Sequence, residues 1–487
     1  FKTFKQRKNI TDKFTLIILV ILGAQMIVNL IGVLGPEISF DALWYHLTLP
    51  KMYLLSGSIS HIPGGLLYYS DMPKLGEMLY ALPLSFGSQT GAKLIHFSFG
   101  LLSLAALYFL SRKFLSSKIS LLVALIFYSN LVVGWESITA YVDLARTFFE
   151  IMALWAFINW WEKEDRKWLV ESAVMLGLAI TVKLIAISSL IIFSLLILLY
   201  FIQKKKKMKS FVGDVSLYWF FSFLIPLPWF VFSFMNTGNP FYPFFTNIYK
   251  TSIEVGFMNP LKFFSDSWNL LVRSQDPISP LYIIFLPIIV FLYPKLKNQI
   301  KTILFYSIIA SIMWYLIPRT GGGRFILPYL PAFSLLTGWV ILEITKIKGE
   351  GWRKLSFSLV IFISLISLFY RGAANHKYLP IIFGKEGKSE FLAKNLNFSF
   401  GDFYDVDSYF EKHIKKTDKV LLYGFHNLYY INFPFVDSSW VKKGDKFNFV
   451  AVQNSNLPER FSYWNLVYYN SKTNIKLYSL GGQQWVY

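Results

Sequence analysis

Long apolar blocks separated by short charged connectors make up most of the chain between residues 14 and 371. Each block runs to roughly 14–21 residues, close to the length of helix that crosses the ~30 Å hydrocarbon layer of a bilayer. The pattern therefore predicts eleven transmembrane helices and an all-α, polytopic membrane fold. The predicted spans lie near residues 14–34, 93–111, 119–133, 144–161, 168–181, 184–202, 214–234, 279–294, 302–317, 325–345 and 355–371.

Lysine and arginine are distributed unevenly between the two sets of connectors. With residues 1–13 placed inside, the inside connectors carry 23 Lys and Arg residues, whereas the longer outside loops carry 8. Because positively charged loops stay on the cytoplasmic side, this count predicts an inside N-terminal end and an outside C-terminal end. The first block, Phe14–Leu34, lacks a small-residue cleavage site, so we expect a retained helix rather than a signal peptide.

Two outside loops, 35–92 and 235–278, are longer than ordinary connectors. In the first loop, apolar and aromatic residues recur at helical spacing over Phe40–Leu55, which predicts a helix lying in the membrane interface. The second loop opens with a rigid Gly- and Pro-containing turn at 237–243 and continues into another amphipathic stretch. We therefore expect structured elements on the outside rather than plain connections.

The composition becomes polar and charged from about residue 385. Short apolar runs at 420–424, 449–452 and 476–478 predict buried strands, and 404–416 predicts a helix. About 100 residues suffice for a small folded unit. We therefore predict a membrane domain over 1–375 and a small α/β domain over 385–487, on the outside.

The overall composition fits this assignment. The 487 residues are 54% hydrophobic and carry a net charge of +20, a value that would suggest nucleic acid in a soluble protein. Here the lysines lie in short runs between apolar blocks, so membrane topology explains them and we expect no nucleic-acid partner. The chain has no cysteine, which excludes disulfides, thiolate metal sites and a cysteine nucleophile.

Asp41 is the first acidic candidate, because it follows the first span directly. A carboxylate held at the outer membrane face can act as a general base toward an acceptor hydroxyl or amide. Asp also favours the N-cap of a helix, and a cap would hold the base in place, so both interpretations stay open. We expect His46 and His376 to be packing residues at the interface rather than ligands.

Three further acidic residues are predicted on the same side: Asp71, Glu77 and Asp143. Pro73 suits the first turn of a helix, which would make Asp71 its cap and put Glu77 one turn inside. Asp143 and Arg146 are three apart and can pair on one helix face. Alternatively, acidic residues facing one compartment can bind a divalent cation through their oxygens.

Positive charge on the outside is concentrated at Lys183, Arg319 and Arg324. The two arginines flank Thr320 and three glycines, 321–323. Glycine lets backbone amides approach an anion closely, and arginine binds phosphate through two parallel hydrogen bonds. The segment is thus either a phosphate-binding site or a flexible loop whose arginines meet lipid headgroups.

Six motifs follow one another along the chain. They are Asp41 after the first span, Tyr-Ser-Asp-Met-Pro with its following Glu (69–77), Ala-Tyr-Val-Asp-Leu (140–144), Gly-Leu-Ala-Ile-Thr-Val-Lys (177–183), Gly-Asn-Pro-Phe-Tyr-Pro (238–243) and Gly-Gly-Arg-Phe-Ile-Leu-Pro-Tyr-Leu-Pro (322–331). In this order they resemble the GT-C superfamily of membrane glycosyltransferases, and within it the bacterial protein-mannosyltransferase and aminoarabinose-transferase type. The resemblance covers residues 10 to 375.

This resemblance implies the transfer of one sugar from a polyprenyl-phosphate donor to a lipid, glycan or protein acceptor. The reaction would take place at the outer face of the cytoplasmic (inner) membrane. Asp41 matches the catalytic carboxylate of the first loop, and Asp143 matches the acidic position of the second. Lys183 and Arg324 match the basic residues near the carrier phosphate.

The chain departs from the family pattern beside Asp41. Many members place two acidic residues together there, whereas this chain has Phe40 and Ala42 as neighbours. Inversion with Asp41 as a single base is therefore the simpler mechanism, with a divalent cation left open and no cofactor required. Two other functions remain: a lipid or sugar translocator, and a non-catalytic scaffold subunit of a larger membrane assembly.

Overall fold

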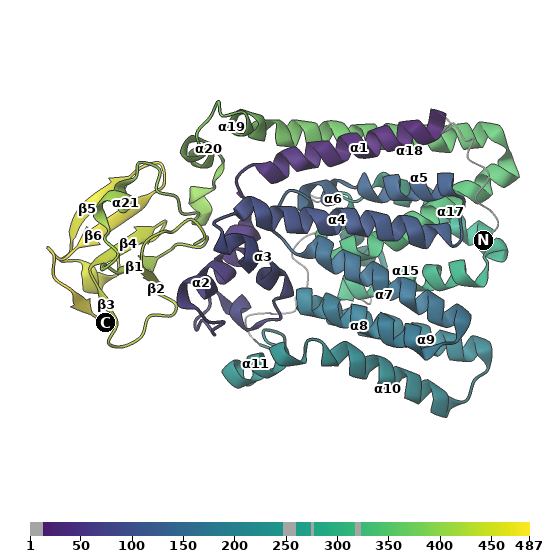
Figure 1. The fold of residues 1–487 in the computed structure, drawn as a ribbon, viewed down its shortest axis with the longest axis horizontal. Coiled ribbons are helices and arrows are strands. Elements are labelled where there is room, and N and C mark those ends of the chain that lie inside the picture. Colours follow the sequence, from purple (N-terminus) through teal and green to yellow (C-terminus); the bar gives the residue numbers. More distant parts are fainter. Residues whose placement is uncertain (1–12, 247–259, 274–276, 317–322) are drawn as a thin grey trace.

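In the computed structural model, the chain forms a helical bundle with a small sheet domain at one end (Figure 1). The structure describes residues 13–246, 260–273, 277–316 and 323–487. The sheet domain holds the C-terminus, and most of the bundle helices run along one common direction away from it. The predicted fold class, a helical membrane protein with a small C-terminal domain, is confirmed.

Each of the eleven predicted spans falls on a helix or on an interrupted run of helices. These are α1 (Lys13–Leu34), α4 (Gln89–Arg112), α5 (Ser117–Tyr128) with α6 (Leu131–Glu136), α7 (Asp143–Lys163), α8 (Arg166–Val182), η3 (Leu184–Ile187) with α9 (Ser188–Lys204), α10 (Met208–Leu224) with α11 (Leu227–Thr237), α13 (Pro280–Phe285) with α14 (Ile289–Leu292), α15 (Asn298–Leu316), α16 (Gly323–Ile326) with η7 (Leu327–Tyr329) and α17 (Leu330–Lys348), and α18 (Glu350–Asn375).

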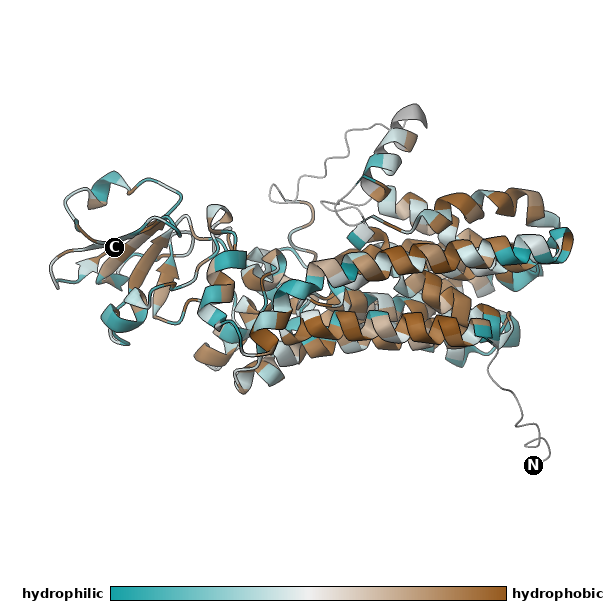
Figure 2. Ribbon diagram, turned by 90° about the horizontal axis from the view of Figure 1, so that it is seen from above, coloured by the Kyte–Doolittle hydropathy of each residue, from teal (hydrophilic) through white to brown (hydrophobic). Residues whose placement is uncertain are grey.

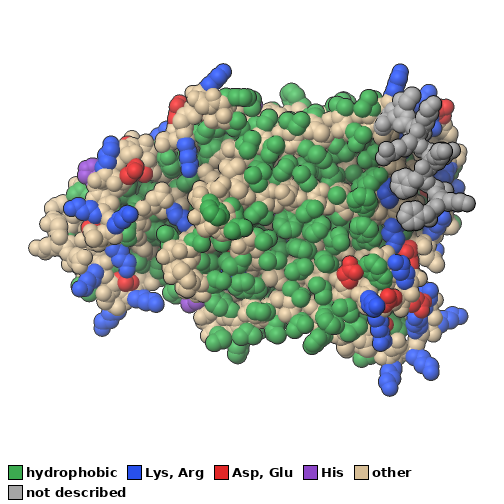
Figure 3. Space-filling view, in the orientation of Figure 1, with side chains coloured by type: hydrophobic (Ala, Val, Ile, Leu, Met, Phe, Trp, Pro, Cys, Tyr) green, Lys and Arg blue, Asp and Glu red, His purple; other side chains and the backbone are tan. Residues whose placement is uncertain are grey.

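Within the described residues, six helices are long and apolar enough to cross a membrane. The pair α10 and α11, bent by 66°, makes a seventh if it counts as one span. The count of eleven crossings therefore stays a prediction. Hydrophobic residues predominate along the bundle helices in the ribbon of Figure 2. On the face drawn in Figure 3, apolar side chains form a broad band and charged side chains gather at its two ends. This is the surface expected of a protein whose middle faces lipid.

The first long loop folds at the end of the bundle that carries the sheet domain. The predicted helix over Phe40–Leu55 is present as a π-helix, Ala42–His46, followed by α2 (Thr48–Ser56). A further helix, α3 (Leu75–Ser85), follows later in the loop. The inner face of α2 is buried in a cluster shared with the C-terminal domain, so this helix supports that domain.

The second long loop is described in part. Asn239 begins its turn by accepting the backbone N–H of Phe241 at 2.9 Å, and the Tyr242–Pro243 peptide is cis. The helix α12 (Pro260–Leu271) accounts for a portion of the amphipathic stretch. Residues 247–259, which join the two, lie outside the described residues.

The C-terminal domain is built on a five-stranded mixed sheet of order β2-β1-β4-β6-β5. Its strands are β1 (Val420–Tyr423), β2 (Phe435–Asp437), β4 (Phe449–Gln453), β5 (Asn465–Asn470) and β6 (Ile475–Ser479). A second, two-stranded sheet pairs β3 (Lys446–Phe447) with β7 (Trp485–Val486). The three predicted strands are confirmed as β1, β4 and β6.

The predicted helix over 404–416 is wrong except for one short turn, α21 (Tyr409–His413). Asp405 Oδ2 accepts the backbone N–H of Glu411 at 2.9 Å, and Asp407 Oδ1 accepts that of Tyr409 at 3.2 Å. Such local side-chain bonds to the backbone compete with helix formation. The Asp residues therefore close a turn where the periodicity of the apolar residues had predicted a helix.

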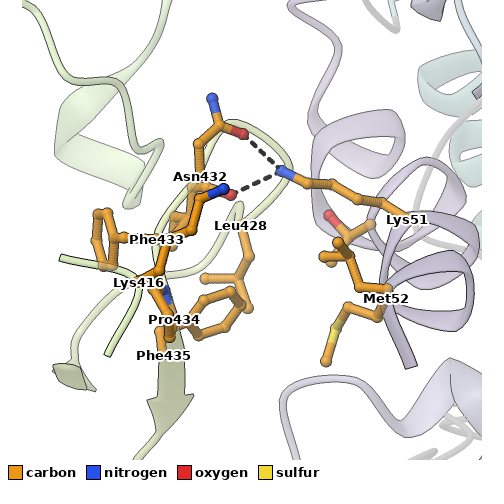
Figure 4. A pocket seen from close by; sticks show the side chains of 11 residues that line it. Lys51, Met52, Lys416, Leu428, Asn432, Phe433, Pro434 and Phe435 are labelled. Atoms are coloured by element: carbon orange, nitrogen blue, oxygen red, sulfur yellow. Dashed lines mark hydrogen bonds between the residues drawn. The ribbon is translucent and has the colours of Figure 1, made fainter. Parts of the chain in front are cut away.

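Lys51 of α2 fastens the C-terminal domain to the bundle (Figure 4). Its Nζ donates to the backbone oxygens of Tyr429 at 2.7 Å and Ile431 at 2.6 Å, and to Asn432 Oδ1 at 3.0 Å. The backbone N–H of Tyr429 donates in turn to the carbonyl of Leu43 at 3.3 Å. A pocket of about 460 Å³ opens beside this contact. The sheet domain is thus hydrogen-bonded to the segment that follows Asp41.

Candidate active site

Asp41 lies where the chain turns from α1 into the π-helix, beside the C-terminal domain. Its Oδ2 accepts a hydrogen bond from Arg324 Nη1 at 2.7 Å, and the two side chains are 14% and 15% exposed. Asp41 Oδ2 also accepts the Tyr45 hydroxyl at 3.5 Å, but the carboxylate makes no capping hydrogen bond to the backbone of the helix it precedes. The N-cap interpretation is therefore wrong, and the carboxylate faces a cation instead.

Asp143 and Lys183 form a second ion pair at the same end of the bundle. Asp143 begins α7, Lys183 follows α8, and Lys183 Nζ donates to Asp143 Oδ1 at 2.6 Å. Asp143 is 1% exposed and Lys183 16%. The predicted pairing of Asp143 with Arg146 is wrong, because Arg146 pairs with Glu150 four residues further along the helix.

Aromatic rings join the two ion pairs into one cluster. Lys183 Nζ and the Arg324 guanidinium lie 5.1 and 5.3 Å from the centre of the Phe325 ring. Arg324 also lies 5.1 Å from the ring centre of Tyr141, whose hydroxyl accepts the backbone N–H of Asp41 at 3.1 Å. Cations over aromatic faces are attracted by the ring quadrupole, which here holds both of them near one ring. Two carboxylates and two cations thus form a single site.

Glu37 is a site residue that the sequence analysis missed. Its Oε1 accepts the backbone N–H groups of Ile38 at 2.9 Å and Ser39 at 2.8 Å. Its Oε2 accepts the backbone N–H of Ala140 at 2.6 Å. The carboxylate is buried and ties the segment before Asp41 to the segment before Asp143. The sequence signal was an acidic residue at the end of an apolar span, where charge is expensive.

His96 fixes the start of α7 from beneath. Its Nδ1 donates to the carbonyl of Thr139 at 3.0 Å, and its Nε2 accepts the backbone N–H of Leu144 at 3.0 Å. These two bonds assign the neutral tautomer with hydrogen on Nδ1. The fully buried ring therefore orients the turn that presents Asp143.

Glu77 and Asp71 each face a histidine. Glu77 Oε1 lies 2.6 Å from His46 Nδ1, and Asp71 lies 2.9 Å from His61 Nδ1. Burial raises the pKa of Asp71, and the neighbouring His61 opposes that rise. The cap interpretation of Asp71 is wrong, since α3 begins after Lys74 with no side-chain cap. His46 is buried, as expected of a packing residue, and its bond to Glu77 also anchors the π-helix that starts after Asp41.

Lys74 is a further buried cation of the first loop. Its Nζ lies 4.5 Å from the ring centre of Trp229 and 4.7 Å from that of Phe232, both on α11. Burial lowers the pKa of Lys74 to about 8, while the charges of Glu77 and Asp71 act in the opposite direction. Lys74 therefore packs the first loop against α11.

The other predicted residues lie elsewhere. Arg319 lies outside the described residues, and the ring of His376 bonds the carbonyl of Ala373 at 2.6 Å on an exposed helix end. No group of three or more His, Asp or Glu side chains that could hold a metal ion occurs in the described part of the chain. The acidic residues considered for a divalent cation instead face Arg324, Lys183 and two histidines.

Comparison with solved structures identifies this architecture. ArnT from Cupriavidus metallidurans bound to undecaprenyl phosphate superimposes with a TM-score of 0.58 at 12% identity, over 95% of this chain and 97% of that one. The Archaeoglobus fulgidus oligosaccharyltransferase AglB, in complex with an inhibitory peptide and a dolichol-phosphate, gives 0.53 at 12% identity, over 96% and 74%. This chain has the GT-C fold. The GT-C resemblance inferred from the motifs over residues 10 to 375 is confirmed, and the structural match extends beyond that range to 95% of the chain.

A family model matches part of the bundle. The model of the dolichyl-phosphate-mannose-protein mannosyltransferase family matches residues 79–231. This range includes Asp143 and Lys183 but neither Asp41 nor Arg324, so the match covers one ion pair of the two. No curated protein sequence matches the chain.

Proposed function

We propose that the chain transfers a single sugar from a polyprenyl-phosphate donor to an acceptor at the membrane surface. The observation that carries this proposal is the joined pair of ion pairs, Asp41–Arg324 and Asp143–Lys183, around Phe325. A donor held in the bilayer by its lipid must be met by a membrane protein, and its phosphate needs cations. A hydroxyl or amide acceptor needs a base beside those cations. This site supplies both kinds of group at one end of the bundle.

In this mechanism Arg324 and Lys183 bind the carrier phosphate. The acceptor oxygen or nitrogen attacks the anomeric carbon and forms the new glycosidic bond, while the bond from that carbon to the phosphate oxygen breaks. Asp41 accepts the acceptor's proton, and the two cations stabilise the negative charge that develops on the departing phosphate. One displacement with one base inverts the anomeric centre.

The remaining acidic residues act on the shape of the site. Glu77 holds His46 at the end of the π-helix that begins after Asp41, and we propose that it supports that carboxylate. Asp143 orients Lys183. Asp71 is assigned a supporting role at the first loop through His61. Arg319 stays a proposed phosphate ligand on its sequence position alone.

We further propose that the site lies at the outer face of the cytoplasmic membrane, with the sheet domain over 385–487 outside. The arginine and lysine count of the connectors supports this orientation. The contact of Phe40 with His426 puts the sheet domain beside Asp41, so an acceptor lipid, glycan or protein passes that domain on its way to the base.

The test is transfer by the purified protein in lipid nanodiscs. A panel of radiolabelled polyprenyl-phosphate sugars is offered together with membrane extract as the source of acceptor. We expect label to pass to an acceptor for at least one sugar and to be lost in Asp41→Asn. A protein that fails to bind polyprenyl phosphate contradicts the proposal. Transfer that persists undiminished in Asp41→Asn contradicts the assignment of the base.

A further inference from the structure

A buried polar network lies one helical turn below the two ion pairs. It consists of Arg146 and Glu150 on α7, Ser189 on α9 and Tyr329 at the end of η7, and all four residues are 0% exposed. We call this set the α7 network. Charged side chains are rare inside membrane bundles, and those present there generally serve function. The mechanism above does not use this network.

Hydrogen bonds connect all four members. Arg146 Nη2 donates to Glu150 Oε1 at 3.2 Å and to the Tyr329 hydroxyl at 3.0 Å. Ser189 Oγ donates to Glu150 Oε1 at 2.8 Å and lies 3.2 Å from the Tyr329 hydroxyl. The hydrogen bonds thus form a closed ring of four residues. This ring connects α7, α9 and η7.

Members of the α7 network follow the site residues closely in the sequence. Arg146 follows Asp143 by three residues on α7, Ser189 follows Lys183 by six, and Tyr329 follows Arg324 by five. The segments that carry Asp143, Lys183 and Arg324 are therefore joined to one another at the network. In the proposed mechanism the cations of the two ion pairs, Lys183 and Arg324, bind the carrier phosphate.

Stability alone does not explain such a network. A buried ion pair costs desolvation that its attraction barely offsets, and apolar replacements of similar volume are often neutral or stabilising. Among the residues that the structure describes, Arg146 Nη1 and Glu150 Oε2 find no hydrogen-bond partner, which adds to that cost. What the network gives is a fixed geometry among three elements.

We propose that the α7 network is a positioning device that sets the distance between Lys183 and Arg324 to fit one phosphate group. This inference rests on the proposed function of those two cations. Within the α7 network, the hydroxyl of Tyr329 is hydrogen-bonded to both Arg146 and Ser189. Removing that single oxygen deletes the hydrogen bonds from η7 to Arg146 and Ser189, while the packing of the ring on Arg146 and both ion pairs remain.

The test variant is Tyr329→Phe, with Tyr282→Phe as its matched control. Tyr282 is also a buried bundle tyrosine with two hydrogen-bond partners, Asn130 and Ser334, and it lies outside the network. We expect Tyr329→Phe to weaken the binding of sugar-free polyprenyl phosphate about 5- to 30-fold, with the control close to wild type. Both variants should unfold at similar temperatures, since each loses one buried hydroxyl. Ser189→Ala should weaken binding in the same direction.

Amide hydrogen exchange without ligand gives a second readout. We expect faster exchange over 183–187 and 323–329 in Tyr329→Phe and unchanged exchange there in Tyr282→Phe. If wild type binds polyprenyl phosphate and the two variants bind it equally well, the positioning device is refuted while the proposed function stands. If the wild-type protein does not bind polyprenyl phosphate, the proposed function is contradicted. Equal amide exchange in Tyr329→Phe and Tyr282→Phe would refute the coupling of the three segments.

Discussion

Glu37 and Ala140 lie 103 positions apart in the sequence, and the carboxylate of the first accepts the backbone N–H of the second at 2.6 Å. The same carboxylate accepts the backbone N–H groups of Ile38 and Ser39. One buried side chain therefore holds the backbone just before Asp41 against the backbone just before Asp143. This bond therefore links the two segments that present Asp41 and Asp143.

Glu37→Gln is expected to loosen the site without removing any reacting group. The amide keeps one oxygen and turns the other acceptor into a donor, which then faces a backbone N–H. Such a mismatch costs about 1–3 kcal/mol, and we expect turnover to fall about 5- to 150-fold with polyprenyl phosphate still bound. The measurement is initial rate against donor concentration, with Glu350→Gln, on an exposed ion pair with Arg353, as control. Equal rates in both variants would contradict the role of Glu37.

Asp41→Asn separates base catalysis from phosphate binding. Asparagine has the size of aspartate but cannot take the acceptor's proton, so we expect turnover to fall about 10²- to 10⁴-fold. Because Asp41 competes with the phosphate for Arg324, polyprenyl phosphate should bind this variant at least as tightly as wild type. Isothermal titration measures the affinity. Loss of both binding and turnover would instead mean that Asp41 serves to position Arg324 for the phosphate.

The helices were predictable because their signal is local. An apolar block long enough to cross a bilayer forms a helix regardless of its partners, since the backbone must bond to itself there. The strands β1, β4 and β6 were also predictable, because each contains apolar residues that are buried in the sheet. β5 was missed because its residues Asn465–Asn470 are largely exposed at the sheet edge and form no buried run.

The residues of the candidate site were predictable, but their pairing was not. Asp41, Asp143, Lys183 and Arg324 were all singled out, yet the spacing rule offered Arg146 as a partner for Asp143 because it considers one helix at a time. Lys183 is 40 residues away from Asp143, and only the fold brings it to 2.6 Å. The Arg146–Glu150 pair could have been predicted from the sequence, because a separation of four residues favours ion pairs on a helix.

Orientation in the membrane can be measured cleanly because the chain has no cysteine. Lys205 lies exposed at the end of α9, and Lys472 is exposed in the turn between β5 and β6. A membrane-impermeant thiol reagent should label Lys472→Cys on intact cells stripped of their outer layers, and Lys205→Cys only after permeabilisation. Labelling of both sites, or of neither, before permeabilisation would contradict the predicted orientation.

Lys183 and Arg324 are the proposed ligands of the carrier phosphate. Removing a charge-assisted hydrogen bond costs roughly 1.5–3 kcal/mol, so Lys183→Ala and Arg324→Ala should each weaken polyprenyl phosphate binding about 10- to 150-fold. Arg324→Lys should recover part of the loss, because an ammonium cannot form the two parallel bonds of a guanidinium. Binding is measured with polyprenyl phosphate in nanodiscs, and Lys113→Ala, which breaks the ion pair with Glu162, is the control.

Lys183→Ala also leaves Asp143 buried beside no cation, which by itself destabilises the fold. The double variant Asp143→Asn, Lys183→Met removes both charges together and so separates folding from binding. We expect it to unfold near the wild-type temperature and still to bind polyprenyl phosphate at least about 10-fold more weakly. Wild-type affinity in this double variant, together with wild-type affinity in Arg324→Ala, would mean that the phosphate is held elsewhere. The joined ion pairs would then be a structural latch between the first loop and α7.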